Sequence, residues 1–462
     1  MSVSQSPRWY LRLPVAFAAA WLVWGAPAVC EPAERPAPDL EAGQAAYLQH
    51  CARCHGASGK GDGLDAKRFY PRPRDLTMGV YKFRSTVSGT PPTDDDLFRT
   101  ITQGLPGTNM PDWAHLDEAA RWQLVEYLKR LAPLFDEATP QPITVPPGPG
   151  RGQADLKRGR AVYERLGCAA CHGGAGRANG TSAGGFVDDW GMPIRPANLT
   201  QGWSYRGGSD PQAVLTRILS GIDGTGMPSY AEALPPEDAW PLAHYVASLQ
   251  EPPHWNMIAH PLAVEGALPA TLDDPRWDRA ERTDVRLRNV VTPAGEWANP
   301  PTVKAISFQA VANAEGLAFR LAWDDPTQDG GAPPDGVAVI LKPAGSAGDV
   351  VTLQVWPYED APPLDICYWA ADTGKAFEAV AASFEPVRAR STPRTMLESL
   401  ASYEDGRWRA LLRRSLHPAT PAGAAAIEPN GFTAVAFAVW DGGNPGARAV
   451  SPWTDLALRQ EQ

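Results

Sequence analysis

The chain has 462 residues, and its 42 lysines and arginines against 52 aspartates and glutamates give a formal net charge of −10. This length allows several domains, each large enough to bury a core of its own. The acidic balance argues against nucleic acid or an anionic membrane surface as a partner, because like charges repel. A basic patch on another protein is compatible with it.

The first 28 residues predict a secretory signal peptide. Arg8 and Arg12 precede an apolar run from Leu13 to Trp24, and small residues follow at positions 26–28. The run is about a dozen residues long, too short to cross a bilayer, so we predict a soluble, periplasmic mature protein. An uncleaved anchor and a lipid on Cys30 are the alternatives, and the residue before that cysteine, a valine, fits lipoprotein processing poorly.

Two Cys-x-x-Cys-His motifs follow, and they end at His55 and His172. This spacing is typical of a covalently attached c-type haem, in which the two thiols bind the porphyrin and the histidine binds the iron. A zinc site would need a second ligand pair nearby, and a redox dithiol does not call for the histidine. We therefore predict two haem c groups, attached through Cys51, Cys54, Cys168 and Cys171.

A methionine lies at the same distance after each histidine, at Met110 (110 − 55 = 55) and at Met227 (227 − 172 = 55). Both stand in a Gly-x-x-Gly-Thr-x-Met-Pro frame. A thioether opposite the histidine leaves no open position on the iron, which suits electron transfer. We expect Met110 and Met227 to be the second axial ligands, and we expect the frameless Met78, Met192 and Met257 to be packing or loop residues.

The spacing indicates an internal duplication with an offset of 117 residues, since 168 − 51 = 117 and 227 − 110 = 117. Each copy predicts a helix that ends at the cysteine motif, a Gly/Pro-rich loop, a short helix before the methionine and a closing helix. In the first closing helix, Trp122, Val125, Leu128 and Leu131 form one apolar stripe. The two copies resemble class I cytochrome c, over about residues 39–134 and 152–251.

Residues 273–462 have a different pattern, with short alternating apolar runs separated by Gly, Pro, Asp and Asn. Such runs occur at 317–323, 337–341, 351–355 and 435–439, and they predict an antiparallel β-sandwich. The expected fold is therefore multidomain: two all-α cytochrome c domains followed by an antiparallel β-sandwich.

Several segments of this last region resemble the ethylbenzene-dehydrogenase-type haem-binding domain. That family comprises the γ subunits of periplasmic molybdopterin enzymes acting on ethylbenzene, dimethyl sulfide, selenate, chlorate or nitrite. The resemblance implies molybdopterin and iron–sulfur partner subunits and an external periplasmic cytochrome. It rests on residues 323–327, 335–339, 363–369 and 437–442, and residues 71–86 of the first copy resemble the cytochrome domains that accompany such enzymes.

The resemblance also implies a haem b held between a methionine and a lysine, but this chain departs from that pattern. Where the family has the methionine, residues 355–358 have none, and the block with the lysine has Arg448. The domain's one methionine is Met396 and its lysines are Lys304, Lys342 and Lys375. A third haem, of type b, and a sandwich without haem that serves as a docking surface both stay open.

Three functional classes follow. The first, which we favour, is an electron-transfer subunit of a periplasmic molybdopterin oxidoreductase complex, with no catalytic residue of its own. The second is a free-standing dihaem shuttle whose sandwich docks another partner. The third is a dihaem enzyme such as a peroxidase or a thiosulfate dehydrogenase, which is disfavoured because both irons have a methionine candidate. The remaining histidines have no counterpart in the repeat, so we expect surface or packing roles for them.

Overall fold

The computed structural model describes residues 35–148, 155–188, 191, 193–289, 301–342, 353, 364–381, 395–417, 425, 427–428, 431–444 and 447–458. The predicted signal peptide at 1–28, Cys30, Met192, residues 355–358 and the side chain of Arg448 lie outside this description. Residues 38–462 form one compact unit, and residues 35–37 belong to a separate one. No described helix is long and apolar enough to cross a membrane.

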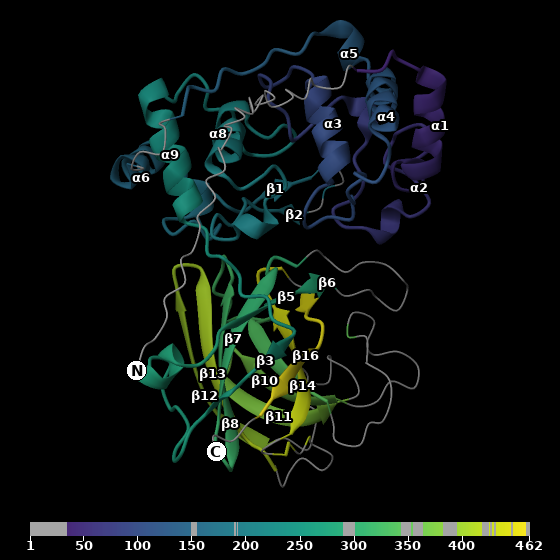
Figure 1. Ribbon diagram of the computed structural model, residues 1–462. Helices are drawn as coiled ribbons and strands as arrows, with labels where there is room; N and C mark the ends of the chain where they lie inside the picture. Colours follow the sequence, from purple (N-terminus) through teal and green to yellow (C-terminus); the bar gives the residue numbers. More distant parts are fainter. Residues whose placement is uncertain are drawn as a thin grey trace, which may run out of the picture. The chain divides into compact units, whose positions relative to one another are not determined.

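The first cytochrome copy is helical, as predicted (Figure 1). Thr93 caps the helix Asp94–Gln103, because its hydroxyl accepts from the Asp96 amide while the Asp96 carboxylate accepts from the Thr93 amide. The predicted apolar stripe of the closing helix contributes to the core of this copy. The elements are α1 (Leu40–His50), α2 (Ala52–His55), η1 (Ala66–Arg68), η2 (Leu76–Met78), α3 (Asp94–Gln103), α4 (Glu118–Leu131) and α5 (Leu134–Glu137).

The second copy repeats the same order of helices and adds a short antiparallel pair of strands. This pair corrects the all-α prediction for the copy, and it lies in the loop between the cysteine motif and the methionine. The elements are α6 (Leu156–Arg165), α7 (Ala169–His172), β1 (Phe186–Val187), β2 (Pro193–Ile194), η3 (Gly202–Ser204), α8 (Pro211–Ser220) and α9 (Pro236–Ser248).

The first and last helices of each copy approach closely at a glycine. A Cβ on Gly43 of α1 would lie 2.3 Å from the carbonyl oxygen of Gln123, and one on Gly159 of α6 would lie 2.1 Å from that of Pro241. The next turn of each helix carries a buried tyrosine, and the hydroxyls of Tyr47 and Tyr163 each donate to a carbonyl just after the cysteine motif at 2.7 Å. The duplication therefore extends to individual packing contacts.

An ion pair joins the two copies. Arg84 of the first copy is fully buried, and its guanidinium lies 2.7 Å from Asp223 Oδ1 of the second copy. The same guanidinium donates to the Ser220 carbonyl at 3.2 Å, and the Ser88 hydroxyl donates to Asp223 at 2.7 Å. A buried pair of this kind fixes orientation, because separating it would leave an uncompensated charge.

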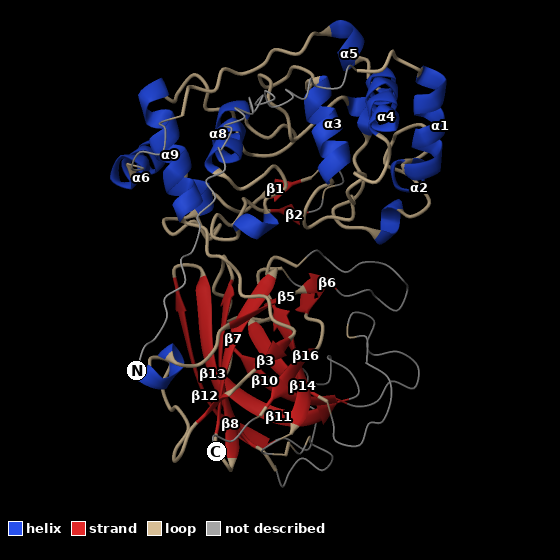
Figure 2. Cartoon of the chain, viewed as in Figure 1, coloured by secondary structure: helices blue, strands red, loops and turns tan. Residues whose placement is uncertain are grey.

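The C-terminal region is a large mixed sheet that is nearly barrel-shaped, preceded by η4 (Pro275–Asp278) (Figure 2). Its strands run in one hydrogen-bonded series from β3 to β4, and β5, β6 and β15 pair at the side of this series. They are β3 (Ile258–Ala259), β4 (Leu262–Ala263), β5 (Thr283–Arg286), β6 (Arg288–Asn289), β7 (Ala305–Ala312), β8 (Gly316–Asp324), β9 (Gly336–Leu341), β10 (Leu364–Ala370), β11 (Lys375–Ala381), β12 (Thr395–Glu404), β13 (Arg407–Ser415), β14 (Phe432–Trp440), β15 (Arg448–Val450) and β16 (Thr454–Ala457).

The strictly antiparallel prediction is wrong at both ends of the series. β3 pairs with β16 and β4 pairs with β7, both in parallel. Both short strands come from the segment that leads out of the second copy, where no alternating apolar pattern occurs. The segment covers unpaired backbone groups at the sheet edges, which would otherwise be open to pairing with another chain.

Apolar side chains cover both faces of the central strands. β9 and β10 are buried along their whole length, because alternate residues contribute to two different hydrophobic cores. Trp323, Trp369 and Trp408 pack together in one of these cores, with the Trp323 and Trp408 rings stacked at 6.1 Å. The rings account for three of the chain's 17 tryptophans and anchor the ends of β8, β10 and β13.

We expect Gly43→Ala and Gly159→Ala each to destabilise its own cytochrome copy. The new methyl group would meet the backbone of the closing helix, which cannot rotate away as a side chain can. Overpacking of this kind costs about 1–3 kcal/mol and outweighs the gain in helix propensity of about 1 kcal/mol. Thermal unfolding of the full chain, followed by circular dichroism, measures the loss.

Gly174→Ala is the matched control, because this exposed glycine has no atom within 4 Å of an added Cβ. Equal unfolding curves for Gly43→Ala and the control would contradict the close helix contact.

Candidate functional site

One cavity of about 680 Å³ passes both cysteine motifs. The structure brings every predicted site residue to its wall: Cys51, Cys54, His55 and Met110 from the first copy, and Cys168, Cys171, His172 and Met227 from the second. Residues of the sheet domain line the same cavity. The two sets of predicted ligands therefore share one enclosure, which the sequence did not indicate.

Each motif histidine is held by a backbone carbonyl. His55 Nδ1 lies 3.0 Å from the Arg74 oxygen, and His172 Nδ1 lies 2.9 Å from the Ala197 oxygen. A carbonyl only accepts, so Nδ1 carries the hydrogen and Nε2 keeps a free lone pair, as an iron ligand requires. Burial lowers the pKa of both rings, which favours this neutral form.

The two methionines stand in loops with the same hydrogen bonds. The carbonyl of Met110 accepts from the Leu105 amide and that of Met227 accepts from the Ile222 amide, each at 3.1 Å. The hydroxyl of Thr108 accepts from the Met110 amide at 3.0 Å, as that of Thr225 does from Met227 at 3.2 Å. The Gly-x-x-Gly-Thr-x-Met-Pro frame thus builds one loop twice and aims one thioether into the cavity from each.

The cysteines of the motifs are free thiols at the cavity wall. Burial raises the pKa of Cys51 to about 12 and that of Cys168 to about 11. The described cysteines form no disulfide with one another. Two thiols at the cavity wall beside a histidine with a free nitrogen fit covalent attachment of haem in both places.

Two cations at the cavity wall strengthen this fit. Lys304 comes from the sheet domain, just before β7, and Arg206 comes from the second cytochrome copy. Neither side chain forms a hydrogen bond or ion pair with any described residue. Burial, together with the charge of Arg206, lowers the pKa of Lys304 to about 8. Cations at the cavity wall without a paired anion suit a group that brings its own carboxylates, as haem does with its propionates.

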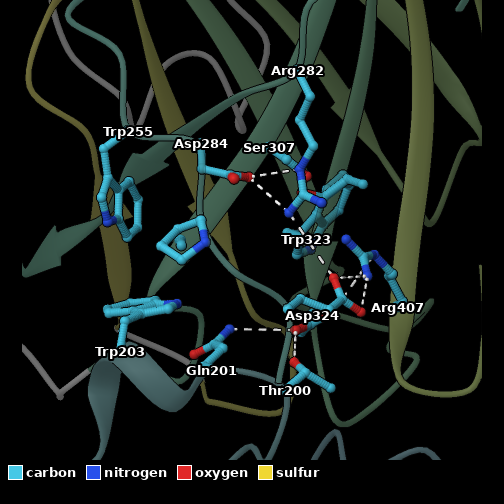
Figure 3. A pocket seen from close by; sticks show the side chains of 14 residues that line it. Thr200, Gln201, Trp203, Trp255, Arg282, Asp284, Ser307, Trp323, Asp324 and Arg407 are labelled. Carbon is cyan, nitrogen blue, oxygen red and sulfur yellow. Dashed lines mark hydrogen bonds and ion pairs between the residues drawn. The ribbon is translucent and has the colours of Figure 1, made fainter. Parts of the chain in front are cut away.

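A second, much smaller pocket of about 40 Å³ lies where the second copy meets the sheet domain (Figure 3). Its centre is Asp324, whose Oδ2 accepts from Asn198 at 2.8 Å, Thr200 at 3.2 Å and Gln201 at 3.3 Å. Beside it, Arg407 pairs with Glu251 at 3.0 Å. The pocket has room for a few water molecules only and its charges are paired, so it serves as a junction.

This junction depends on one difference between the copies. Asn198 and Asp75 occupy equivalent positions, and each accepts the amide of a following threonine. Only the asparagine also has an NH₂ group, which it donates to Asp324. The sequence showed the Asp-to-Asn difference, but the sheet residue that it contacts is 126 positions away.

Three of the described candidates for a haem b ligand lie in two different places, at the cavity and on the neighbouring strands β11 and β12. Met396 lies on β12 with 60% of its surface exposed, and Lys304 lies at the haem c cavity. Lys375 begins β11 as an exposed residue. Residues 355–358 lie outside the description.

Comparison with known proteins agrees with the two cytochrome c regions. Residues 38–128 and 154–246 match the family described as cytochrome C oxidase, cbb3-type, subunit III. The cbb3-type cytochrome c oxidase subunit CcoP of Azospirillum sp. (strain B510) is 27% identical over 220 residues, which cover 46% of this chain and 62% of that protein. The chain thus spans about three fifths of the length of this curated relative.

A putative respiratory nitrate reductase heme subunit, ORF7 of Haloferax mediterranei, is 27% identical over 162 residues, or 34% of this chain and 56% of that protein. Among solved structures, the reducing HAO-like protein complex Kustc0457/Kustc0458 of Kuenenia stuttgartiensis is 40% identical, covering 47% of this chain and 100% of that one, with a TM-score of 0.44. Residues 38–128 and 154–246 are cytochrome c domains similar to those of the cbb3-type subunit III family.

Proposed function

We propose that this chain is a periplasmic dihaem c-type cytochrome that carries electrons as the γ-like subunit of a molybdopterin oxidoreductase complex. The observation that supports the dihaem part is the duplicated set of thiols, carbonyl-bound histidine and methionine along one cavity. A histidine and a methionine on opposite faces leave no position for a substrate, which favours electron transfer over catalysis.

The bound haems would supply one-electron chemistry, and the chain's own residues set the conditions for it. Cys51, Cys54, Cys168 and Cys171 would hold the groups covalently. The backbone carbonyls behind His55 and His172 orient the rings and increase their basicity. Lys304 and Arg206 would neutralise carboxylates inside the cavity, which favours the reduced state.

The proposed complex rests on two further considerations. The similar CcoP and ORF7 proteins are named as subunits, one of an oxidase and one of a respiratory nitrate reductase. The sheet domain resembles the γ-subunit family, which implies molybdopterin and iron–sulfur subunits on one side and an external cytochrome on the other. A free-standing shuttle is the second candidate, and a dihaem enzyme is the third.

Haem content tests the dihaem proposal. We expect a pyridine haemochrome spectrum of the mature protein to show two c-type haems per chain, and acid–acetone to extract neither. One c-type haem or none would overturn the assignment. An additional extractable haem b would place a third group in the sheet domain.

Native purification tests the complex. We expect the chain, isolated from its own organism without detergent or high salt, to co-elute with molybdenum and an iron–sulfur polypeptide in a fixed ratio. Elution as a single copy of this chain without molybdenum would favour the free shuttle instead.

We expect Met110→Ala and Met227→Ala each to open one iron to exogenous imidazole or cyanide and to lower the potential of that haem, because the thioether favours the reduced state. Visible spectroscopy and a redox titration measure both effects. Met78→Ala and Met257→Ala are matched controls, since these side chains are 63% and 87% exposed. Unchanged spectra in the first pair would show that another residue is the sixth ligand.

We expect Lys304→Met to lower the potential of one haem, because a nearby positive charge favours reduction. If the lost attraction is about 1 kcal/mol, the one-electron shift is about 40 mV. Lys375→Met is the control, because Lys375, at the start of β11, is not among the residues that line the cavity. Equal potentials in both variants would mean that Lys304 contacts no haem carboxylate.

A further inference from the structure

Three buried carboxylates converge at one end of the sheet domain. Asp325 follows β8, Asp335 precedes β9 and Asp441 follows β14. One carboxylate oxygen from each lies within 4.8 Å of the others, and the residues are 0%, 0% and 5% exposed. Three like charges are thus gathered where water does not reach them.

Nothing described in the chain neutralises this cluster. No lysine or arginine among the described residues forms an ion pair with Asp325, Asp335 or Asp441, and Arg195 acts on Asp441 only from a longer distance. Burial and the neighbouring carboxylates raise the pKa of Asp325, and burial raises that of Asp335. A bound cation or added protons must therefore balance the charge.

The three carboxylates of the cluster differ in their hydrogen bonding. Asp335 is satisfied, because it accepts from Trp408 Nε1 at 3.0 Å, from the Asp329 amide at 2.7 Å and from the Gly442 amide at 2.8 Å. In contrast, Oδ2 of Asp325 and both carboxylate oxygens of Asp441 are buried without a partner. Buried oxygens of this kind are rare and costly, so each needs a ligand.

Among the described residues, Asp441 has no hydrogen-bond donor on either of its carboxylate oxygens. The Thr302 hydroxyl and the Gly443 amide act on its pKa from nearby, but neither donates a hydrogen bond of normal geometry to it. Its two oxygens are therefore free to bind a cation that lies between the loops.

A cradle of oxygens at Gly443 extends the cluster. A Cβ at this glycine would lie 2.7 Å from Thr327 Oγ1, 2.9 Å from Asp329 Oδ2 and 3.2 Å from Asp441 Oδ1. Asp329 Oδ2 is itself buried without a partner. Two loops thus direct side-chain oxygens at one point, and the lack of a side chain at position 443 keeps that point open.

We propose that Asp325, Asp335, Asp441 and the adjacent Asp329 form a calcium site. All the ligands are oxygens, with no histidine or thiol among them, which selects a hard cation. Calcium accepts six to eight oxygens at about 2.3–2.6 Å in irregular arrangements, whereas magnesium requires a near-ideal octahedron and retains its waters. Four carboxylates from two separate loops suit calcium better.

The site would tie together parts of the chain that function depends on. It joins the end of β8 to the start of β9 and the end of β14. Asp324, next to Asp325, is the acceptor that holds the second cytochrome copy, and Pro326 and Gly443 line the haem cavity. Calcium would therefore stabilise both the junction and the cavity wall, whichever partner the cytochromes serve.

The test uses the full-length, haem-loaded protein. After dialysis against EGTA and then metal-free buffer, calorimetric titration with calcium chloride should show one site per chain. The unfolding temperature should rise with calcium and much less with magnesium. No heat of binding and no change in unfolding temperature would overturn the proposal.

Asp441→Asn should weaken calcium affinity at least tenfold, because it removes a charge and an open ligand. Asp372→Asn, in the exposed turn between β10 and β11, is the matched control and should bind as the wild type does. If Asp441→Asn raised the unfolding temperature by the same amount with and without calcium, protons alone would balance the charge of the cluster. If the variant does not fold, the calcium content of the purified wild-type protein, measured before EGTA treatment, decides the matter.

Discussion

The hydrogen bond from each motif histidine to a backbone carbonyl is the constraint on which the rest of the cytochrome region depends. It connects His55 to a carbonyl 19 residues later and His172 to one 25 residues later, so the ring cannot be placed until the Gly/Pro-rich loop has folded. The same loops carry Asp75 and Asn198, and they form one wall of the cavity that the methionine loops close. The position of the ligands, the shape of the cavity and the conformation of the loop therefore depend on one another, and the same arrangement occurs in both copies.

Duplication supplied the scaffold, and single polar differences then gave the copies separate tasks. The second copy donates from Asn198 to the sheet domain, where the first copy has an aspartate that cannot donate. The first copy instead inserts Arg84 against Asp223 of the second. Each contact is short, directional and largely buried, so it specifies an orientation more than it adds stability.

How far the sequence predicted the site follows from the range of each signal. Covalent attachment and axial ligation go with recurring spacings in the sequence. The cysteines, histidines and methionines could therefore be predicted as haem ligands from the sequence alone. Lys304 could not, because it reaches the cavity from another domain and carries no local pattern. The same holds for β3 and β4, whose apolar residues lack alternation and pair only because edges of the sheet are free. The carboxylate cluster lies within segments 323–327, 335–339 and 437–442, which the sequence alone identifies only by a family resemblance. The cluster itself could not be predicted, because only the fold brings these turns together.

The positions of Lys304 and Asp324 indicate that the sheet domain does more than dock a partner. A domain that merely docked a partner would need only a linker to the cytochromes, yet this one lines their cavity and holds the second copy through Asp324. Glu251, at the end of that copy, pairs in turn with Arg407 of β13. If haem carboxylates bind Lys304 as proposed, a displacement of the sheet would move this cation relative to them, and a nearby charge is one of the few terms that sets a haem potential. Binding of a partner to the sheet domain could thus adjust electron transfer without any contact with the haems themselves.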